Sequence, residues 1–373
     1  MRPSLWQTFA LDMDARRPGF AVGPWFTMNA MLALDDALNA DQLASAFGEL
    51  QRRHDVLNAN ASLELVSESA LHVPVPLEAP VRLQLSADHL TLHLHHMVSD
   101  PVTLWLALSE LAALYSGEEL PPAVQFADYI LDEASQLDRT ADAASEWWRS
   151  QVTDAKVCSQ PSPAPSAASS SSAPADAGSP FAYRSDLLSP AEVARVEQLT
   201  REHRSTPLVT LLAALSAAMN PAEGDTLVLN TLFSKRDRPA WQRVLGPCIV
   251  PSVLAVPRST GSLAADVPAM RDAVVNCSRY ARFPVLSLDV PSRTPFFEYV
   301  PQQWPGAYSF GSVRGDVVGA AGPKDTGLAD ALAIRMRPAT TGVLIGHFSG
   351  DGTDWTEPLV TSLVHTFRDY LLG

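Results

Sequence analysis

The chain has 373 residues, 46% of them hydrophobic, so it is long enough to bury a large core and its length is typical of two domains or lobes. Its formal net charge of -14 argues against binding to nucleic-acid phosphates, and we expect no nucleic-acid partner. Three scattered cysteines, and no apolar stretch of the roughly 20 residues that a membrane span needs, predict a protein of the reducing cytoplasm without disulfides or membrane insertion.

Strand-like and helix-like segments alternate through the first part of the chain. A strand comes first, and apolar residues at helical spacing then predict helices over 40–54 and 103–115. Between them, the alternation of apolar and polar residues from Leu90 to His95 predicts a half-buried strand.

A segment rich in Ser, Ala and Pro divides the chain. These residue types make up 19 of the 22 residues at 159–180, a composition with too little apolar surface to offset the entropy of ordering. We therefore predict an N-terminal lobe (1–157), a linker (158–180) and a C-terminal lobe (181–373).

The C-terminal part also alternates between the two kinds of element. A strand is predicted over 181–187, and a helix begins after Ser189 and Pro190, which suit the N-cap and the first helical position. Further segments follow at 207–219, 226–233, 262–280, 331–336, 343–349 and 357–372. The pattern predicts an α/β fold in two halves.

The best indication of chemistry lies where the strand before residue 96 ends. Successive strand side chains point to opposite faces, so His95 and His96 diverge. A neutral imidazole, with an ordinary pKa of about 6.5, can accept a proton at neutral pH, although most strand histidines are structural. A metal site at His93, His95 and Asp100 is a weaker alternative, because no further cluster completes a coordination shell. We predict no metal and no resident cofactor.

Residues 95–101 resemble the HHxxxDG motif of nonribosomal peptide synthetase condensation domains and their chloramphenicol acetyltransferase-like relatives. Other family segments occur in the same order. They are 52–57 (similar to RHExLR), 125–129 (YxDY), 146–148 (a tryptophan-bearing helix), 207–215 (the central helix of the second lobe), 235–239 (GRxxP, with Gly246 ten residues after Arg236) and 293–297 (SRNPLF). The resemblance covers essentially the whole chain.

This resemblance implies two chloramphenicol-acetyltransferase-like αβ lobes in a V-shaped pseudo-dimer, with the active-site tunnel between them. It also implies a free-standing, shortened condensation-type acyltransferase in nonribosomal peptide or hybrid polyketide biosynthesis. Such an enzyme moves an acyl or peptidyl group from a carrier-protein thioester to an amine or hydroxyl acceptor. We expect a monomer that receives its donor in trans on the phosphopantetheine of a carrier protein, with coenzyme A as an alternative donor.

The family match also assigns roles to four residues. His96 is the catalytic residue, which abstracts a proton from the acceptor or positions it by a hydrogen bond. Asp100 pairs with Arg236 in a bridge that ties the two lobes together, and His95 orients the loop from the opposite face of the strand. The alternative for Arg236 is a surface arginine beside Asp237.

Three departures from the family pattern leave alternatives open. Pro101 replaces the motif glycine, residues 246–251 lack the usual Asn and Thr, and only about forty residues separate His54 from His95. The alternatives are a degenerate condensation-fold protein that binds a carrier or recruits another enzyme, and an epimerisation-type domain. Retention of His96, Asp100 and Arg236 together favours catalysis.

A carrier-docking site on so acidic a chain should be a local basic or apolar patch. The candidate clusters are Arg16 with Arg17, and Arg236 with Arg238 and Arg243. For each arginine the alternative is an ordinary solvated or ion-paired side chain.

Overall fold

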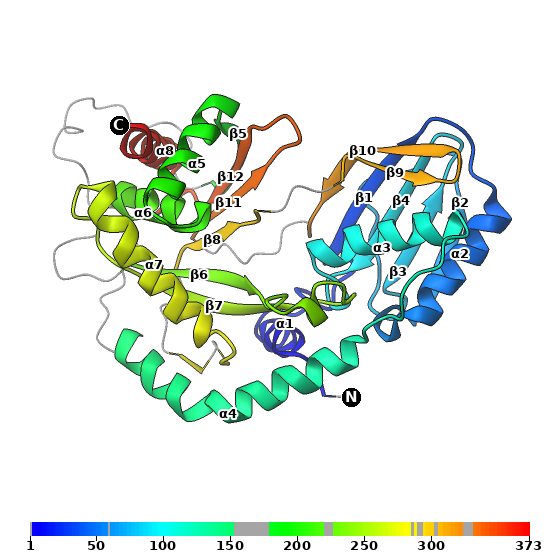
Figure 1. Ribbon diagram of the computed structural model, residues 1–373, viewed down its shortest axis with the longest axis horizontal. Helices are drawn as coiled ribbons and strands as arrows, with labels where there is room; N and C mark the ends of the chain where they lie inside the picture. Colours follow the sequence, from blue (N-terminus) through cyan, green and yellow to red (C-terminus); the bar gives the residue numbers. More distant parts are fainter. Residues whose placement is uncertain are drawn as a thin grey trace. The chain divides into compact units, whose positions relative to one another are not determined.

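The computed structural model describes residues 2–58, 60–152, 179–219, 227–284, 287–288, 294–301, 305–323 and 331–373. The predicted linker lies outside these residues except for Ser179 and Pro180, as do Cys158 and Arg293. The chain forms two compact units, and each contains a six-stranded sheet with helices (Figure 1). The α/β fold predicted from the sequence is confirmed.

The two units are not continuous in sequence. Unit 1 comprises Met1–Arg139, Ser234–Val250 and Trp304–Thr326, and unit 2 comprises Thr140–Phe233, Pro251–Gln303 and Gly327–Gly373. The division proposed from the sequence cuts the chain once, at the Ser/Ala/Pro-rich segment. In the structure, two segments from the C-terminal half belong to unit 1, because they pair or pack with elements far away in sequence.

Unit 1 is built on a mostly antiparallel sheet. Its strand order is β2-β3-β4-β1-β10-β9, and β2 and β3 form its parallel pair. The strands are β1 (Thr27–Leu34), β2 (Ala61–Leu65), β3 (Val81–Leu85), β4 (His89–His95), β9 (Ala307–Phe310) and β10 (Val313–Ala321). Strand β10 pairs with β1, so a hairpin from late in the chain completes the sheet (Figure 1).

Helices cover one face of this sheet. They are α2 (Ala40–Arg53) and α3 (Pro101–Tyr115), which agree with the predicted helices at 40–54 and 103–115. On β4, Leu90, Leu92 and Leu94 are fully buried in the same apolar cluster as side chains of both helices. Because strand side chains alternate, Thr91, His93 and His95 lie on the other face.

Two further helices belong wholly or partly to unit 1. The sequence placed a strand first, but the chain opens with α1 (Leu5–Arg16), whose apolar residues do not follow a clear helical period. Helix α4 (Phe126–Val152) begins in unit 1 and continues into unit 2. Short 3₁₀ turns occur at η1 (Asp55–Leu57) and η2 (Pro239–Trp241). In the part of the chain that the structure describes, no helix combines the length and apolar character of a membrane span.

Unit 2 contains the second sheet, with strand order β5-β12-β11-β8-β6-β7. Its strands are β5 (Phe181–Leu188), β6 (Leu227–Ser234), β7 (Ile249–Val256), β8 (Phe296–Tyr299), β11 (Leu332–Pro338) and β12 (Leu344–Gly350). Its helices are α5 (Pro190–Glu202), α6 (Pro207–Met219), α7 (Leu263–Arg279) and α8 (Glu357–Leu372). Ser189 caps α5 through a capping box with Glu192, as the sequence predicted for this N-terminus.

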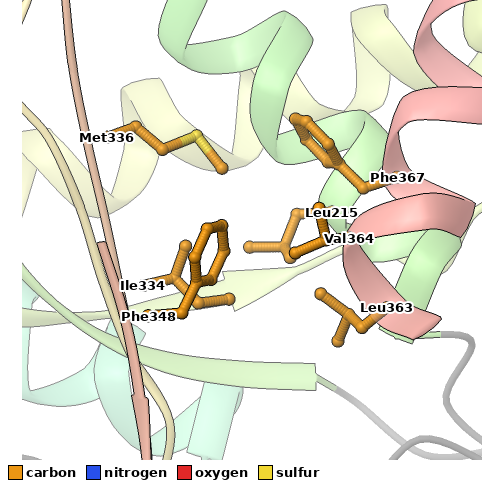
Figure 2. A pocket seen from close by; sticks show the side chains of 7 residues that line it. All are labelled: Leu215, Ile334, Met336, Phe348, Leu363, Val364 and Phe367. Carbon is orange, nitrogen blue, oxygen red and sulfur yellow. The ribbon is translucent and has the colours of Figure 1, made fainter. Parts of the chain in front are cut away.

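The core of unit 2 lies between one face of this sheet and its helices. A small apolar pocket remains there (Figure 2), between β11 and β12 on one side and α6 and α8 on the other. It is lined by Leu215, Ile334, Met336, Phe348, Leu363, Val364 and Phe367. These side chains offer no hydrogen-bonding group, and the pocket is too narrow for a water molecule, so it is a packing gap of the core.

Candidate active site

The candidate site is the turn that joins β4 to α3 in unit 1. Strand β4 ends at His95, and Asp100 is the N-cap of α3, where its Oδ1 accepts a hydrogen bond from the Thr103 amide at 2.7 Å. Pro101 is the first residue of the helix. At this position an amide N–H has no partner within the helix, so proline in place of the family glycine is compatible with the helix start.

His96 is held by its own turn. Only 8% of the residue is exposed. Its Nδ1 lies 2.6 Å from the Ser99 carbonyl oxygen, which can only accept, so Nδ1 carries the proton. In the neutral ring, Nε2 therefore carries the lone pair. The backbone amide of His96 donates to the Phe26 carbonyl at 2.7 Å, which fixes the base of the side chain.

Two aromatic side chains flank the imidazole of His96. The Trp6 indole Nε1 donates to the His96 carbonyl at 2.9 Å, and the two ring centroids are 4.7 Å apart. The Phe26 ring centroid lies 4.9 Å from that of His96. Gln7 donates from Nε2 to the Met97 carbonyl at 2.9 Å. The first turn of α1 therefore supports two consecutive residues of the histidine loop.

Helix α1 is in turn anchored to α4. The Leu5 amide donates to Oε2 of Glu133 at 2.7 Å, and the Tyr129 hydroxyl donates to Oε1 of the same carboxylate at 2.9 Å. Glu133 is buried. The motifs in the sequence did not indicate this support. The Ser4 and Gln7 side chains form a capping box, and this Ser-x-x-Gln spacing is the signal that could have located the start of α1.

His95 and His93 lie on the opposite face of β4 from its leucines, and both are fully buried. His95 donates from Nε2 to the Gly23 carbonyl at 3.3 Å and accepts at Nδ1 from the Met97 amide at 3.2 Å. The contact with Met97 fits the loop-orienting role predicted for His95. His93 contacts Asn29 Oδ1 through Nδ1 at 2.7 Å. Burial lowers the pKa of each imidazole to about 4, so both are neutral at pH 7.

Asp100 and Arg236 form the ion pair that the sequence predicted. Nη2 of Arg236 lies 3.0 Å from Oδ1 and 3.1 Å from Oδ2 of Asp100, so a single nitrogen contacts both oxygens. The carboxylate also accepts from the Thr103 hydroxyl at 2.8 Å and from the Cys248 amide at 3.0 Å. Burial alone would lower the pKa of the guanidinium, but the facing Asp100 carboxylate raises it.

The remaining donors of Arg236 bind the loop that follows it. Nη1 donates to the carbonyls of Trp241 at 3.1 Å and Val244 at 2.5 Å, and Nη2 donates to the Gly246 carbonyl at 2.9 Å. Because residues 234–250 belong to unit 1, the Asp100–Arg236 pair lies inside that unit. The pair thus joins two segments far apart in the sequence, one before and one after the Ser/Ala/Pro-rich segment, and its role as a tie between lobes stays a prediction.

Gly246 occupies a position that requires glycine. Its φ of +135° lies outside the range that other residues favour, and an added Cβ would lie 2.3 Å from Cδ2 of Phe126. Its amide donates a hydrogen bond to the Thr103 hydroxyl at 3.0 Å. The family spacing of ten residues after Arg236 correctly marked this glycine.

His96 is the residue of this turn that we consider for acid–base chemistry. Within the described ranges, no three or more His, Cys, Asp and Glu side chains are arranged to hold a metal ion. A buried imidazole with a fixed tautomer can accept a proton from, or a hydrogen bond from, a bound molecule that reaches Nε2. The neighbouring ion pair and caps fix the backbone around it.

In a comparison with protein families, residues 77–295 match the condensation-domain family. This match covers more than half of the 373 residues. A similar curated protein is the beauvericin nonribosomal cyclodepsipeptide synthetase of Beauveria bassiana. It is 25% identical over 293 residues, which cover 65% of this chain and 9% of that protein. The chain thus spans less than a tenth of the length of this relative.

Solved structures share the fold over nearly the full chain. The condensation domain from the monacolin K polyketide synthase MokA has a TM-score of 0.76 at 15% identity and covers 100% of this chain and 97% of its own. The SgcC5 protein from Streptomyces globisporus was solved in complex with (R)-(-)-1-(2-naphthyl)-1,2-ethanediol and sucrose. Its TM-score is 0.74 at 15% identity, and the match covers 99% of this chain and 98% of the SgcC5 chain. The X-domain from teicoplanin biosynthesis has a TM-score of 0.70 at 17% identity, and the match covers 99% of this chain and 93% of the X-domain chain. These likenesses confirm the chloramphenicol-acetyltransferase-like fold class that the sequence resemblance implied.

Replacing Arg236 by Met should lower the free energy of unfolding by about 3–5 kcal/mol, because it leaves the Asp100 carboxylate buried and unpaired. The double variant Asp100→Asn/Arg236→Met should recover part of this loss. Urea denaturation measures both. The matched control is Arg238→Met, whose partly exposed guanidinium pairs with Asp132 at 3.0 Å and should cost less than about 1 kcal/mol. Equal losses for Arg236→Met and Arg238→Met would contradict the central role of the buried pair.

The buried histidines should make stability fall in acid. His93 and His95 stay neutral in the folded protein down to about pH 4, whereas in the unfolded chain they take up protons near pH 6.5. The free energy of unfolding is therefore unaffected by these two histidines above about pH 6.5. As the pH falls toward 4, it decreases by about 2–3 kcal/mol for each histidine, because the unfolded chain binds the protons that the folded protein excludes. Urea denaturation of the wild type and His93→Gln between pH 7 and 4.5 isolates the share of His93. A variant with the same pH slope as the wild type would contradict the assignment.

Proposed function

This chain belongs to the condensation-domain family, and on that premise we propose that it is an acyltransferase with His96 as its catalytic residue. It moves an acyl or peptidyl group from a thioester to an amine or hydroxyl acceptor, which forms an amide or an ester. The biosynthetic setting proposed is that of nonribosomal peptides or hybrid polyketides.

The observation that carries this proposal is the hydrogen bond from His96 Nδ1 to the Ser99 carbonyl. It places the lone pair of the neutral ring on Nε2, which is the state a general base needs. As the acceptor nitrogen or oxygen attacks the thioester carbon, its proton passes to Nε2 or is held there by a hydrogen bond. The C–S bond then breaks, and the departing thiolate takes up the proton that the acceptor has given up, so that Nε2 is again unprotonated.

Which of the two roles His96 performs depends on the acceptor. An α-amine has an ordinary pKa of about 7.7–8.0, so part of it is already neutral near pH 7 and needs orientation more than deprotonation. An alcohol does not ionise in this range and has more need of a base. The fixed tautomer of His96 serves either acceptor, because Nε2 accepts in both cases.

The donor in this proposal is a thioester on the phosphopantetheine of a carrier protein that acts in trans, with coenzyme A as the alternative. Support for both product types comes from similar proteins. The name of the beauvericin synthetase specifies a cyclodepsipeptide, which contains ester as well as amide bonds. The SgcC5 structure holds a naphthyl ethanediol, which carries hydroxyl groups. We extend these acceptor classes to this chain as part of the proposal.

A second candidate function is recruitment without turnover. The likeness to the teicoplanin X-domain and the altered residues 247–251 favour it. Pro101 gives it little support, because proline suits the first position of α3. The retained His96 geometry and the intact Asp100–Arg236 pair favour the acyltransferase instead.

His96→Ala should abolish acyl transfer, with a loss of about 10²–10⁴-fold or more, because the base or positioning group is gone. Intact-mass spectrometry of an acyl-loaded carrier, incubated with a panel of amines and alcohols, measures unloading and product. The control is His89→Ala, which removes a partly exposed histidine of the same strand and should retain activity. Carrier binding without turnover across the panel would favour recruitment, and α-proton exchange without an acceptor would favour epimerisation.

Trp6→Phe should lower kcat about fivefold with little change in KM, because a lost hydrogen bond costs about 1 kcal/mol. Phenylalanine keeps an aromatic ring beside His96 but cannot donate to its carbonyl. Steady-state kinetics with the acyl-loaded carrier separate the two constants. Trp25→Phe, at a tryptophan that is 46% exposed, is the matched control. A rise in KM with kcat unchanged would contradict a positioning role for Trp6.

A further inference from the structure

The carboxylate of Glu133 acts as a second cap for helix α1. Its Oε2 accepts a hydrogen bond from the amide of Leu5, the first residue of the helix, at 2.7 Å. The first amides of a helix have no partner within it, and the N-terminal end of the helix dipole favours negative charge. Glu133 lies on α4, 128 positions after Leu5, so this cap fixes the start of α1 to another helix.

Glu133 is itself held in one orientation. The residue is 3% exposed, and its Oε1 accepts from the hydroxyl of Tyr129, one turn earlier on α4, at 2.9 Å. Each carboxylate oxygen therefore receives a different donor. Hydrogen bonds to a charged acceptor are stronger than those between neutral groups. The side chain is almost out of contact with solvent, so water does not readily replace these bonds.

The turn that Glu133 holds is also the turn that contacts the histidine loop (residues 96–99). Trp6 donates from its indole to the His96 carbonyl at 2.9 Å. The Gln7 side chain accepts at Oε1 from the amide of the N-cap residue at 3.0 Å, and its Nε2 donates to the Met97 carbonyl at 2.9 Å. A displacement of α1 from α4 therefore moves the donors of both carbonyls together, and with them the backbone that carries the imidazole.

The same connection reaches the buried pair of Asp100 and Arg236. The ring centroid of Tyr129 lies 5.8 Å from that of Trp241, in an edge-to-face contact within a small apolar cluster. The Trp241 carbonyl accepts from Nη1 of Arg236 at 3.1 Å. Nη2 of Arg236 binds Asp100, the N-cap of α3. Tyr129 and Glu133 thus join the two supports of the histidine loop to each other.

Arg236 is committed to this arrangement and does not contribute to a basic docking surface. The sequence suggested Arg236, Arg238 and Arg243 as one cluster. In the structure the Arg236 side chain is 5% exposed, and Arg238 and Arg243 lie 3.0 Å and 3.9 Å from a carboxylate oxygen. The expectation of a docking patch is therefore wrong for Arg236, because its guanidinium is buried behind the histidine loop.

We infer that Glu133 is a positioning residue for His96. Its oxygens bind Leu5 and Tyr129, so it acts through the first turn of α1. The inference rests on the proposed function, which places the reaction at Nε2 of His96. A base must stay within hydrogen-bond reach of the proton that it accepts, and a small displacement of a reacting group lowers the rate steeply. Loss of Glu133 therefore lowers kcat and leaves KM nearly unchanged.

Steady-state kinetics with the acyl-loaded carrier test this inference. Glu133→Ala should lower kcat about tenfold with little change in KM, since two buried hydrogen bonds to the carboxylate are lost. The matched control is Asp138→Asn, which changes an exposed acid on the same helix and in the same unit and should keep the wild-type kcat. A rise in KM at constant kcat, or an equal loss of kcat in the control, would overturn the inference.

A conservative variant covers the case in which Glu133→Ala does not fold. Glu133→Gln keeps the size of the side chain and one acceptor oxygen, so it retains one of the two bonds. Its kcat should lie between those of the wild type and the alanine variant, about threefold below the wild type. A folded Glu133→Gln with wild-type kcat would count against Glu133 as a positioning residue.

Coupling to Trp6 separates positioning from a general loss of stability. If Glu133 acts through the first turn of α1, the effects of Trp6→Phe and Glu133→Ala on kcat overlap. The double variant should then lose about tenfold, as Glu133→Ala does alone. Independent fivefold and tenfold effects would multiply to about 50-fold. A loss of that size would show that Glu133 acts by another route.

Hydrogen–deuterium exchange of the full chain gives a readout that needs no turnover. In Glu133→Ala, exchange should be about tenfold faster in residues 5–8 and 96–99 and unchanged in α2 of the same unit, because the loss of the cap loosens these two segments alone. A rise spread evenly over unit 1 would indicate general destabilisation and refute the inference. The absence of any rise in a folded variant would refute it too.

The two readouts distinguish failure of this inference from failure of the proposed function. A local rise in exchange, in a chain whose wild type transfers no acyl group, would refute the acyltransferase and leave Glu133 as the residue that holds the histidine loop. Acyl transfer by the wild type, with kcat and exchange unchanged in folded Glu133→Ala, would refute this inference alone.

Discussion

The buried pair of Asp100 and Arg236 is the interaction on which the rest of unit 1 depends. Their side chains are 1% and 5% exposed, and charges so well removed from water persist only when each finds partners. The partners come from the N-terminal turn of α3 and from the loop of residues 236–248. Two segments far apart in sequence are thereby fixed against each other, directly behind the turn that carries His96.

The geometry of His96 follows from two supports that meet at the same turn. One is local, because the strand ends, the chain turns and Asp100 caps the next helix. The other arrives from α1, where Trp6 and Gln7 bind the carbonyls of residues 96 and 97, and Glu133 of α4 holds the start of that helix. A catalytic loop needs such reinforcement, since a shift of about 1 Å in a reacting group can cost a large part of the rate.

Part of the fold and of the candidate site could be predicted from the sequence. The histidine motif, the helix after it, the Asp100–Arg236 pair and the conformation-specific Gly246 all carry local signals or fixed spacings. The support from Trp6 could not be found in this way. It depends on which distant residues become neighbours in the fold, and composition and periodicity do not reveal that.

The hairpin of β9 and β10 has a consequence for how the protein is made. Asn29 of β1 pairs with Ala321 of β10, and the two residues are 292 positions apart. During synthesis on the ribosome, β1 therefore waits with one edge open until β10 has emerged. An unpaired edge is a template for wrong partners, and contacts of such long range slow folding. Nascent chains, and chains that end before β10, are thus the forms most exposed to aggregation.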